Sequence, residues 1–159
     1  MCAARISYQD PTGMYLIPSG AKINADLYID TVLKPVLTRN IPRLYGKQKG
    51  KVVFHHDNAP AHQANKTQEY LRKSRVKFIS KEHYSDNSPD LAPMDFAVNG
   101  IFKNLLFKKK PRADGGFERA IKTEGLKLPM DKIRNTLKSW KGRVKLMLEK
   151  TGYQIQRLL

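Results

Sequence analysis

Two aspartates, Asp57 and Asp95, stand at positions where carboxylates suit metal chemistry. Asp57 comes at the end of a predicted strand, Asp95 follows Pro93 at the start of a predicted helix, and 37 residues lie between them. Such carboxylates suit Mg²⁺, which takes oxygen ligands and in pairs clamps the attacking and leaving oxygens of an in-line phosphoryl displacement. The alternative is structural: Asp57 caps the helix that follows it, and Asp95 complements its own helix dipole.

The composition favours a polyanionic partner. The 159 residues include 30 Lys and Arg against 14 Asp and Glu, a formal net charge of +16, and residues 101–159 hold most of that excess. A basic flank beside an acidic centre suits a nucleic-acid enzyme, because phosphates must be drawn to acids that otherwise repel them. A solvated lysine surface is the alternative. No apolar run approaches 18 residues, so no membrane partner is expected.

The elements that must position these aspartates are short strands and helices in alternation, which predicts an α/β fold. The turn residues predict a hairpin of Ile6–Tyr8 and Met14–Ile17 around a turn at Pro11–Gly13. The hydrophobic pattern then predicts a helix from Asn24, its candidate N-cap, to Leu37, which Pro35 bends or ends, and a loop over Arg43–Lys51. After these come a strand over Val52–Phe54, a helix from Ala59 to Lys73 with Pro60 in its first turn, a strand over Val76–Ile79, and a helix from Pro93 to Leu106.

A basic amphipathic helix is predicted near the C-terminus. Its apolar stripe is Ile133, Leu137, Trp140, Val144 and Met147, and its basic stripe is Arg134, Lys138, Lys141 and Lys145. Trp140 is expected in the core rather than as a base-stacking platform. The basic stripe is a candidate for phosphate contacts, as is a second cluster, Lys108, Lys109, Lys110 and Arg112, for which simple solvation is the alternative.

Two motifs surround the aspartates, His56-Asp57-Asn58-Ala59-Pro60-Ala61-His62 and Ser88-Pro89-Asp90-Leu91-Ala92-Pro93-Met94-Asp95-Phe96. In type and order they resemble the mariner branch of the Tc1/mariner transposases, and the similarity extends over nearly the whole chain. The resemblance assigns the family's second and third catalytic, metal-binding aspartates to Asp57 and Asp95. Their spacing is similar to that of the DD37D lineage.

The resemblance implies a ribonuclease H-like core of the DDE/D transposase and integrase kind. It also implies Mg²⁺ or Mn²⁺ as cofactor, cleavage and strand transfer of DNA, a homodimer or pairing with a full-length transposase, and a nuclear location. Residues beside the aspartates are expected in supporting roles. These are His56 as a neighbour of Asp57, Asn58 orienting Asp57 or capping a helix, His62 bonded near the site or on the surface, and Asp90 bracing its loop.

The family's first catalytic aspartate lies on the first strand, farther upstream than the 56 residues that precede Asp57 here. We therefore expect a single, N-terminally truncated catalytic domain over residues 1–159, with a basic helical part at about 113–159. Its core is expected to lack the first, central strand, so that the isolated chain folds poorly, re-pairs its strands or needs another polypeptide to complete its sheet. Such a fragment retains nucleic-acid binding and is expected to be catalytically inactive. The alternative is a recruited, non-catalytic DNA-binding or interaction protein; an RNA-binding protein is disfavoured because no RNA-binding signature is present.

Overall fold

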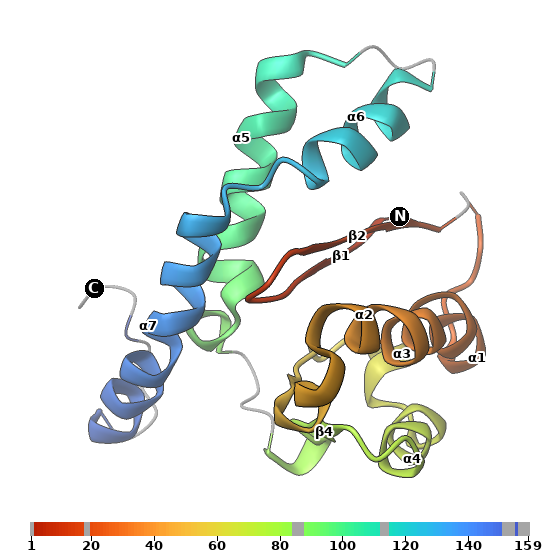
Figure 1. Ribbon diagram of the computed structural model, residues 1–159, viewed down its shortest axis with the longest axis vertical. Helices are drawn as coiled ribbons and strands as arrows, with labels where there is room; N and C mark the ends of the chain where they lie inside the picture. Colours follow the sequence, from red (N-terminus) through yellow and green to blue (C-terminus); the bar gives the residue numbers. More distant parts are fainter. Residues whose placement is uncertain (1, 18–19, 84–87, 112–114, 151–154, 156–159) are drawn as a thin grey trace. The chain divides into compact units, whose positions relative to one another are not determined.

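The computed structural model describes residues 2–17, 20–83, 88–111, 115–150 and 155 (Figure 1). The chain forms two compact units. The first unit comprises residues 1–3 and 15–86, and the second unit comprises residues 4–14 and 87–159. The expectation of one domain over residues 1–159 stays a prediction.

The predicted hairpin is confirmed, but its turn lies earlier in the chain than expected. Strands β1 (Cys2–Ile6) and β2 (Pro11–Leu16) form a two-stranded sheet. The Ser7 hydroxyl donates to the carbonyl of Asp10 at 2.7 Å and accepts from the N–H of Asp10 at 3.0 Å. Because this side chain closes the turn over residues 7–10, Pro11 becomes the first residue of β2, a strand position that proline tolerates.

A helical run follows from Ala25 to Tyr45. It consists of α1 (Ala25–Tyr28), two π-type segments (Ile29–Leu33 and Val36–Asn40) and α2 (Ile41–Tyr45). The cap at Asn24 is confirmed, since its Oδ1 accepts from the N–H of Leu27 at 2.9 Å. Pro35 does not end the run, because wider π-type turns on both sides accommodate its ring and missing N–H. The expected loop at 43–51 is wrong: Arg43–Tyr45 belongs to α2, and Gly46–Lys51 is a 3₁₀ helix.

Strands β3 (Val53–Phe54) and β4 (Lys77–Phe78) pair in parallel, with Val53 opposite Lys77 and Phe54 opposite Phe78. Their connection contains α3 (Pro60–Gln63) and α4 (Asn65–Lys73). Pro60 lies in the first turn of α3, as predicted, and α4 ends at Lys73, as predicted. The single helix expected over this stretch is wrong, because Ala64 is extended (ψ 137°) and separates α3 from α4.

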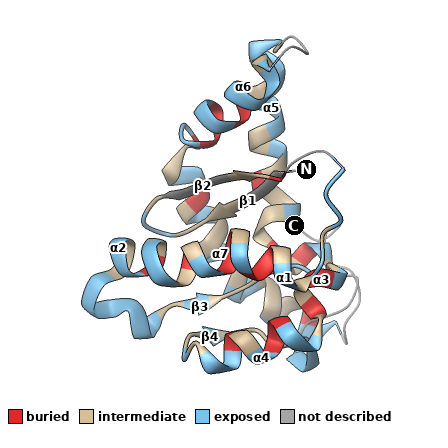
Figure 2. Cartoon of the chain, turned by 90° about the vertical axis from the view of Figure 1, so that its right-hand side faces the viewer, coloured by how far each residue is buried: buried red, intermediate tan, exposed pale blue. Residues whose placement is uncertain are grey.

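The core of the first unit packs around the helical run. Its buried residues are Tyr28, Ile29, Val32, Leu33, Val36, Ile41, Ala61 and Leu71. In Figure 2 buried positions are visible along α1, α3 and α4. Leu33 and Leu71 are fully buried, and each buried side chain of this size stabilises the unit by roughly 1.5–3 kcal/mol. Ala61 joins this core, which anchors α3 beside the strand pair.

The second unit is mostly helical. A run from Met94 to Lys109 combines a π-type turn (Met94–Val98) with α5 (Asn99–Lys109), and α6 (Gly116–Gly125) and α7 (Met130–Glu149) follow. Helices α6 and α7 both lie within the helical part expected at about 113–159, although the periodicity of the sequence singled out only α7. Val98, Leu128 and Ile133 form the buried centre, with Ile6 packed against it. The predicted helix over 130–147 is confirmed as α7, in which Trp140 is half-buried and donates its Nε1–H to the Leu91 carbonyl at 2.8 Å.

Among the described residues the strands make two separate two-stranded sheets, β1–β2 and β3–β4. The mixed helix and strand composition confirms the predicted α/β class, although helices dominate. In the same part of the chain, no helix is long and apolar enough to span a membrane.

Candidate active site

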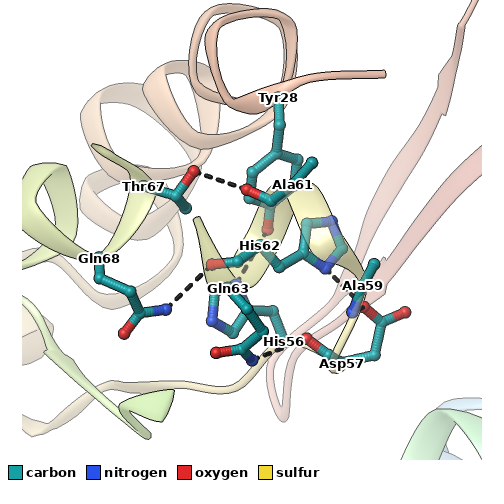
Figure 3. Close-up of polar contacts among 9 residues, drawn as sticks. All are labelled: Tyr28, His56, Asp57, Ala59, Ala61, His62, Gln63, Thr67 and Gln68. Atoms are coloured by element: carbon teal, nitrogen blue, oxygen red, sulfur yellow. Dashed lines mark hydrogen bonds and ion pairs between the residues drawn. The ribbon is translucent and has the colours of Figure 1, made fainter. Parts of the chain in front are cut away.

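Asp57 lies just beyond the carboxyl end of β3, the edge of a parallel strand pair at which α/β proteins place ligands. Its side chain is 62% exposed. One carboxylate oxygen, Oδ1, is held twice: the backbone N–H of Ala59 donates to it at 3.1 Å, and Nδ1 of His62 lies 2.5 Å away (Figure 3). The structure therefore brings two residues of the first motif, Asp57 and His62, into direct contact.

The contact with His62 further favours the ionised form of Asp57. The hydrogen bond from His62 is the main reason that the pKa of Asp57 lies below its ordinary value, and the N–H of Ala59 contributes in the same direction, while burial opposes both. An ionised carboxylate only accepts hydrogen bonds, so Nδ1 of His62 must carry the proton. Asp57 is thus an anion at neutral pH.

The imidazole of His62 packs against two aromatic neighbours, Tyr28 and His56. Its ring centroid lies 3.9 Å from that of Tyr28 and 5.2 Å from that of His56, and it is nearly parallel to the His56 ring at 10°. The Tyr28 hydroxyl also lies 3.4 Å from Nδ1 of His56. Because Tyr28 belongs to the core, these contacts tie the orientation of His62 to the packing of the first unit.

Side chains from α4 hold the short helix that carries His62. A single-turn helix leaves its last carbonyls without partners inside the helix. The Thr67 hydroxyl donates to the carbonyl of Ala61 at 2.6 Å, and Nε2 of Gln68 donates to that of His62 at 2.9 Å. Gln63 reaches back and donates to the Asp57 carbonyl at 3.4 Å (Figure 3). These bonds fix α3 relative to α4 and to the loop of Asp57.

Tyr28, Thr67 and Gln68 were not among the expected site residues. A signal for two of them exists in the sequence: Thr67 and Gln68 share a helix face with Leu71, which is fully buried. Polar side chains on a buried face require hydrogen-bond partners. No local pattern marks Tyr28.

His56 is buried, at 8% exposure, and lies beside His62. Burial is the main cause that lowers its pKa to about 4, helped by the neighbouring His62 and opposed by Asp57. His56 is therefore neutral at pH 7. Its Nε2 has no hydrogen-bond partner among the described residues, so the ring serves chiefly as a packing surface for its neighbours.

Asp95 occupies the position predicted for it, in the first turn of the helical run that starts at Met94. Its side chain is exposed, and Oδ1 accepts from Nδ2 of Asn99 at 3.3 Å. Asp57 belongs to the first unit and Asp95 to the second. Their convergence at one metal site stays a prediction.

Asp90 and Asn58 differ sharply in burial. Asn58 is exposed, whereas Asp90 is 2% exposed and its Oδ2 accepts from the backbone N–H of Ile155 at 2.9 Å. The carbonyl of Asp90 also accepts from Nη1 of Arg143 at 3.3 Å. In this arrangement the Asp90 carboxylate faces the interior of the second unit and links its loop to the C-terminal segment.

The exposed lysines of the second unit are the candidates for phosphate contacts. Lys108 and Lys109 end α5, Lys110 follows it, and Lys138, Lys141 and Lys145 are exposed along α7. Arg134 is engaged within the unit: its Nε donates to the Tyr8 carbonyl at 3.2 Å, and its guanidinium lies 5.9 Å from the centre of the Tyr8 ring. Arg112 lies outside the described residues.

The donor chemistry of Asp57 fits a divalent cation. No group of three or more His, Cys, Asp or Glu side chains with metal-binding geometry occurs in the described part of the chain. Mg²⁺, however, is commonly held by one or two carboxylates, with water and substrate oxygens completing its shell. Asp57 offers an ionised, exposed carboxylate, which suits this mode.

The fold that carries Asp57 is ribonuclease H-like, as its match to the catalytic domain of Mos1 transposase shows. Solved structures of Mos1 transposase have this fold in common with the chain. A Mos1 catalytic domain with raltegravir and Mn matches with a TM-score of 0.78 and 20% identity, over 96% of this chain and 75% of that one. A second structure, of the catalytic domain of Mos1 mariner transposase, gives 0.76 and 18%, over 95% and 73%.

The Mos1 strand transfer complex also matches, with a TM-score of 0.74 and 18% identity over 96% of this chain and 43% of that chain. At these identities the likeness establishes the fold. No family model and no curated protein matches the chain.

Proposed function

We propose that the chain is a mariner-type transposase fragment of the DD37D kind, descended from an enzyme that cleaves and joins DNA with Mg²⁺ or Mn²⁺. The observation that carries this proposal is the exposed Asp57 carboxylate, hydrogen-bonded to His62 beyond the carboxyl end of β3 in a chain with the Mos1 catalytic-domain fold. The chemistry of the motif supports the assignment, because DNA cleavage by this route needs anionic oxygen ligands at such a position.

In this proposal Asp57 and Asp95 are the protein ligands of the metal site. A bound divalent ion supplies Lewis-acid stabilisation for phosphodiester cleavage. In this proposal the contacts of Asp57 with His62 and Ala59, and of Asp95 with Asn99, orient the two carboxylates within their own units. Two of the solved Mos1 catalytic-domain structures contain Mn and Mg respectively, which supports the choice of ion.

The 159 residues supply two of the three carboxylates that the resemblance requires. Among the other aspartates, Asp26 pairs with Lys66 and Asp30 pairs with Lys34, while Asp10 lies in the hairpin turn. None of these contacts suggests a third metal ligand. We therefore propose that this chain by itself binds DNA and metal but cleaves DNA inefficiently. A nuclear location, and pairing with a second copy or with a full-length transposase, belong to the same proposal.

The DNA-binding part of the proposal uses the exposed lysines of α5 and α7. Lys138, Lys141 and Lys145 recur at steps of three and four, so they lie along one side of a 20-residue helix. Lysines of this kind bind the phosphate backbone independently of the DNA sequence, and the affinity of the protein for DNA then falls steeply as the salt concentration rises. A net charge of +16 strengthens the attraction.

The second candidate is a recruited protein that binds DNA without any catalytic role. The exposed lysines favour it as much as they favour a transposase fragment, since they require no metal. The two candidates differ in what Asp57 and Asp95 do.

One experiment separates them. The full chain and its Asp57→Asn and Asp95→Asn variants are titrated with duplex DNA and then incubated with supercoiled plasmid and Mn²⁺. For a transposase fragment, we expect unchanged DNA affinity in all three proteins, nicking by the unmodified chain that is very low or absent, and loss of any Mn²⁺-dependent nicking in both variants. Nicking that survives both substitutions contradicts the metal role of the aspartates, and absence of DNA binding in the unmodified chain contradicts both candidates.

A further inference from the structure

We propose that His62 positions the carboxylate of Asp57 by occupying its Oδ1, so that Oδ2 is the oxygen that ligates the divalent ion. This inference rests on the proposed function for the identity of the ligand. The positioning itself rests on contacts within the first unit.

The two oxygens of Asp57 have different surroundings. Oδ1 accepts from Nδ1 of His62 and from the N–H of Ala59, at 2.5 and 3.1 Å. No hydrogen bond to Oδ2 occurs among the described residues, and the side chain is 62% exposed. A carboxylate held through one oxygen presents the other in a defined direction, which favours monodentate binding of a small, oxygen-seeking ion.

The contact from Ala59 does not explain this arrangement by itself. A carboxylate that accepts from the N–H two residues later is a common local turn motif. His62 adds a second donor from five residues away, on the far side of the first turn of α3. Two donors on one oxygen fix both the rotation of the carboxylate and the direction of the remaining oxygen.

The donor is itself rigid, which a positioning residue requires. Tyr28 packs on the His62 ring from the core, and His56 lies nearly parallel to it. Gln68 holds the backbone carbonyl of His62, and Thr67 holds that of the preceding residue. Rotation of the imidazole away from Asp57 therefore disturbs its packing on Tyr28 and His56, and movement of the backbone breaks the bonds from Gln68 and Thr67. Partners of this kind behind a metal ligand typically contribute 10–100-fold to metal affinity.

The test compares four variants of the full chain by Mn²⁺ titration in the absence of DNA. His62→Asn places an amide N–H close to the position of Nδ1, whereas His62→Gln places the same group one carbon farther out. His62→Leu removes the donor. His83→Leu is the matched control, since His83 is exposed in the same unit and contacts Ser80. Circular dichroism melts establish that each variant is folded.

We expect His62→Leu and His62→Gln to weaken Mn²⁺ binding by about 10–100-fold, and we expect His62→Asn and His83→Leu to remain near the affinity of the unmodified chain. The asparagine and glutamine variants differ only in reach, so their comparison stands even if the leucine variant unfolds. Equal affinity in the asparagine and glutamine variants overturns the positioning role.

A metal-free measurement tests the hydrogen bond directly. The imidazole ¹⁵N spectrum of the unmodified chain at neutral pH is expected to show a protonated Nδ1 in His62, with a signal that shifts in Asp57→Asn. An unprotonated Nδ1 overturns the inference. Loss of Mn²⁺ binding in Asp57→Asn with unchanged binding in His62→Leu overturns it as well and leaves the proposed function standing. Unchanged Mn²⁺ binding in Asp57→Asn instead overturns the proposed function and, with it, the ligand assignment.

Discussion

Thr67 offers a quantitative test of how α3 is held. The substitution Thr67→Val keeps the shape of the side chain and removes its hydroxyl. Thr67 is fully buried, at 0% exposure, and its hydroxyl donates to the Ala61 carbonyl at 2.6 Å. Without that donor a buried carbonyl at the end of a single-turn helix has no partner, a loss of about 1–3 kcal/mol. For a chain of this size each kcal/mol corresponds to roughly 2–4 °C in the midpoint of thermal unfolding.

The assay is thermal and urea unfolding followed by far-ultraviolet circular dichroism. Thr123→Val is the matched control, because the Thr123 hydroxyl donates to the Arg119 carbonyl at 2.9 Å on the exposed surface of α6. Water replaces the lost donor there, so the free energy of unfolding is expected to change by no more than about 0.5 kcal/mol. Thr67→Ser keeps the hydroxyl and loses one methyl group, about 0.8 kcal/mol. Equal stability losses in Thr67→Val and Thr123→Val refute the reasoning.

Three further predictions follow from other contacts. Because burial holds the pKa of His56 at about 4 in the folded chain against 6.5 when unfolded, the unfolded chain binds more protons between these values. The free energy of unfolding should therefore fall by up to about 3 kcal/mol as the pH drops from about 6.5 to 4. Urea melts of His56→Gln should lack this dependence on pH. The lowered pKa of Asp57 changes the stability only at more acidic pH. Asp90→Ala should lower the free energy of unfolding by about 1–3 kcal/mol and speed hydrogen exchange at the amide of Ile155, because that N–H loses its buried acceptor. Asp131→Ala, at an exposed position, should leave the stability and this exchange rate unchanged. DNA-binding titrations at several salt concentrations give the slope of the logarithm of the binding constant against the logarithm of the salt concentration. Replacing Lys138, Lys141 and Lys145 with glutamine should reduce the magnitude of this slope by about 3. An equal reduction on replacing Lys47, Lys49 and Lys51 would point to net charge rather than to α7.

Features that depend on neighbouring residues were predictable from the sequence. The Asn24 cap, Pro60 in a first helical turn and the helix over 130–149 are all confirmed. Each follows from hydrogen bonding or periodicity within a few residues of chain, which the sequence displays directly. The α/β class followed in the same way from the alternation of short strands and helices.

Other features depended on contacts that the local pattern does not contain. The hairpin turn moved to residues 7–10 because the Ser7 hydroxyl closed it there. The helix expected from Ala59 to Lys73 broke at Ala64, and the break allows Thr67 and Gln68 to reach the carbonyls of Ala61 and His62. A continuous helix would satisfy those carbonyls with its own backbone and leave no acceptor for these side chains.

The sequence by itself determined the residue types at the candidate site: a carboxylate after a strand, a histidine five positions later, and a chain with an excess of basic residues. Only the tertiary structure decided that His62 faces Asp57 rather than solvent. The reason is physical, since the direction of the imidazole depends on the core around Tyr28 and on hydrogen bonds from α4, and neither is expressed in the spacing of the two residues along the chain.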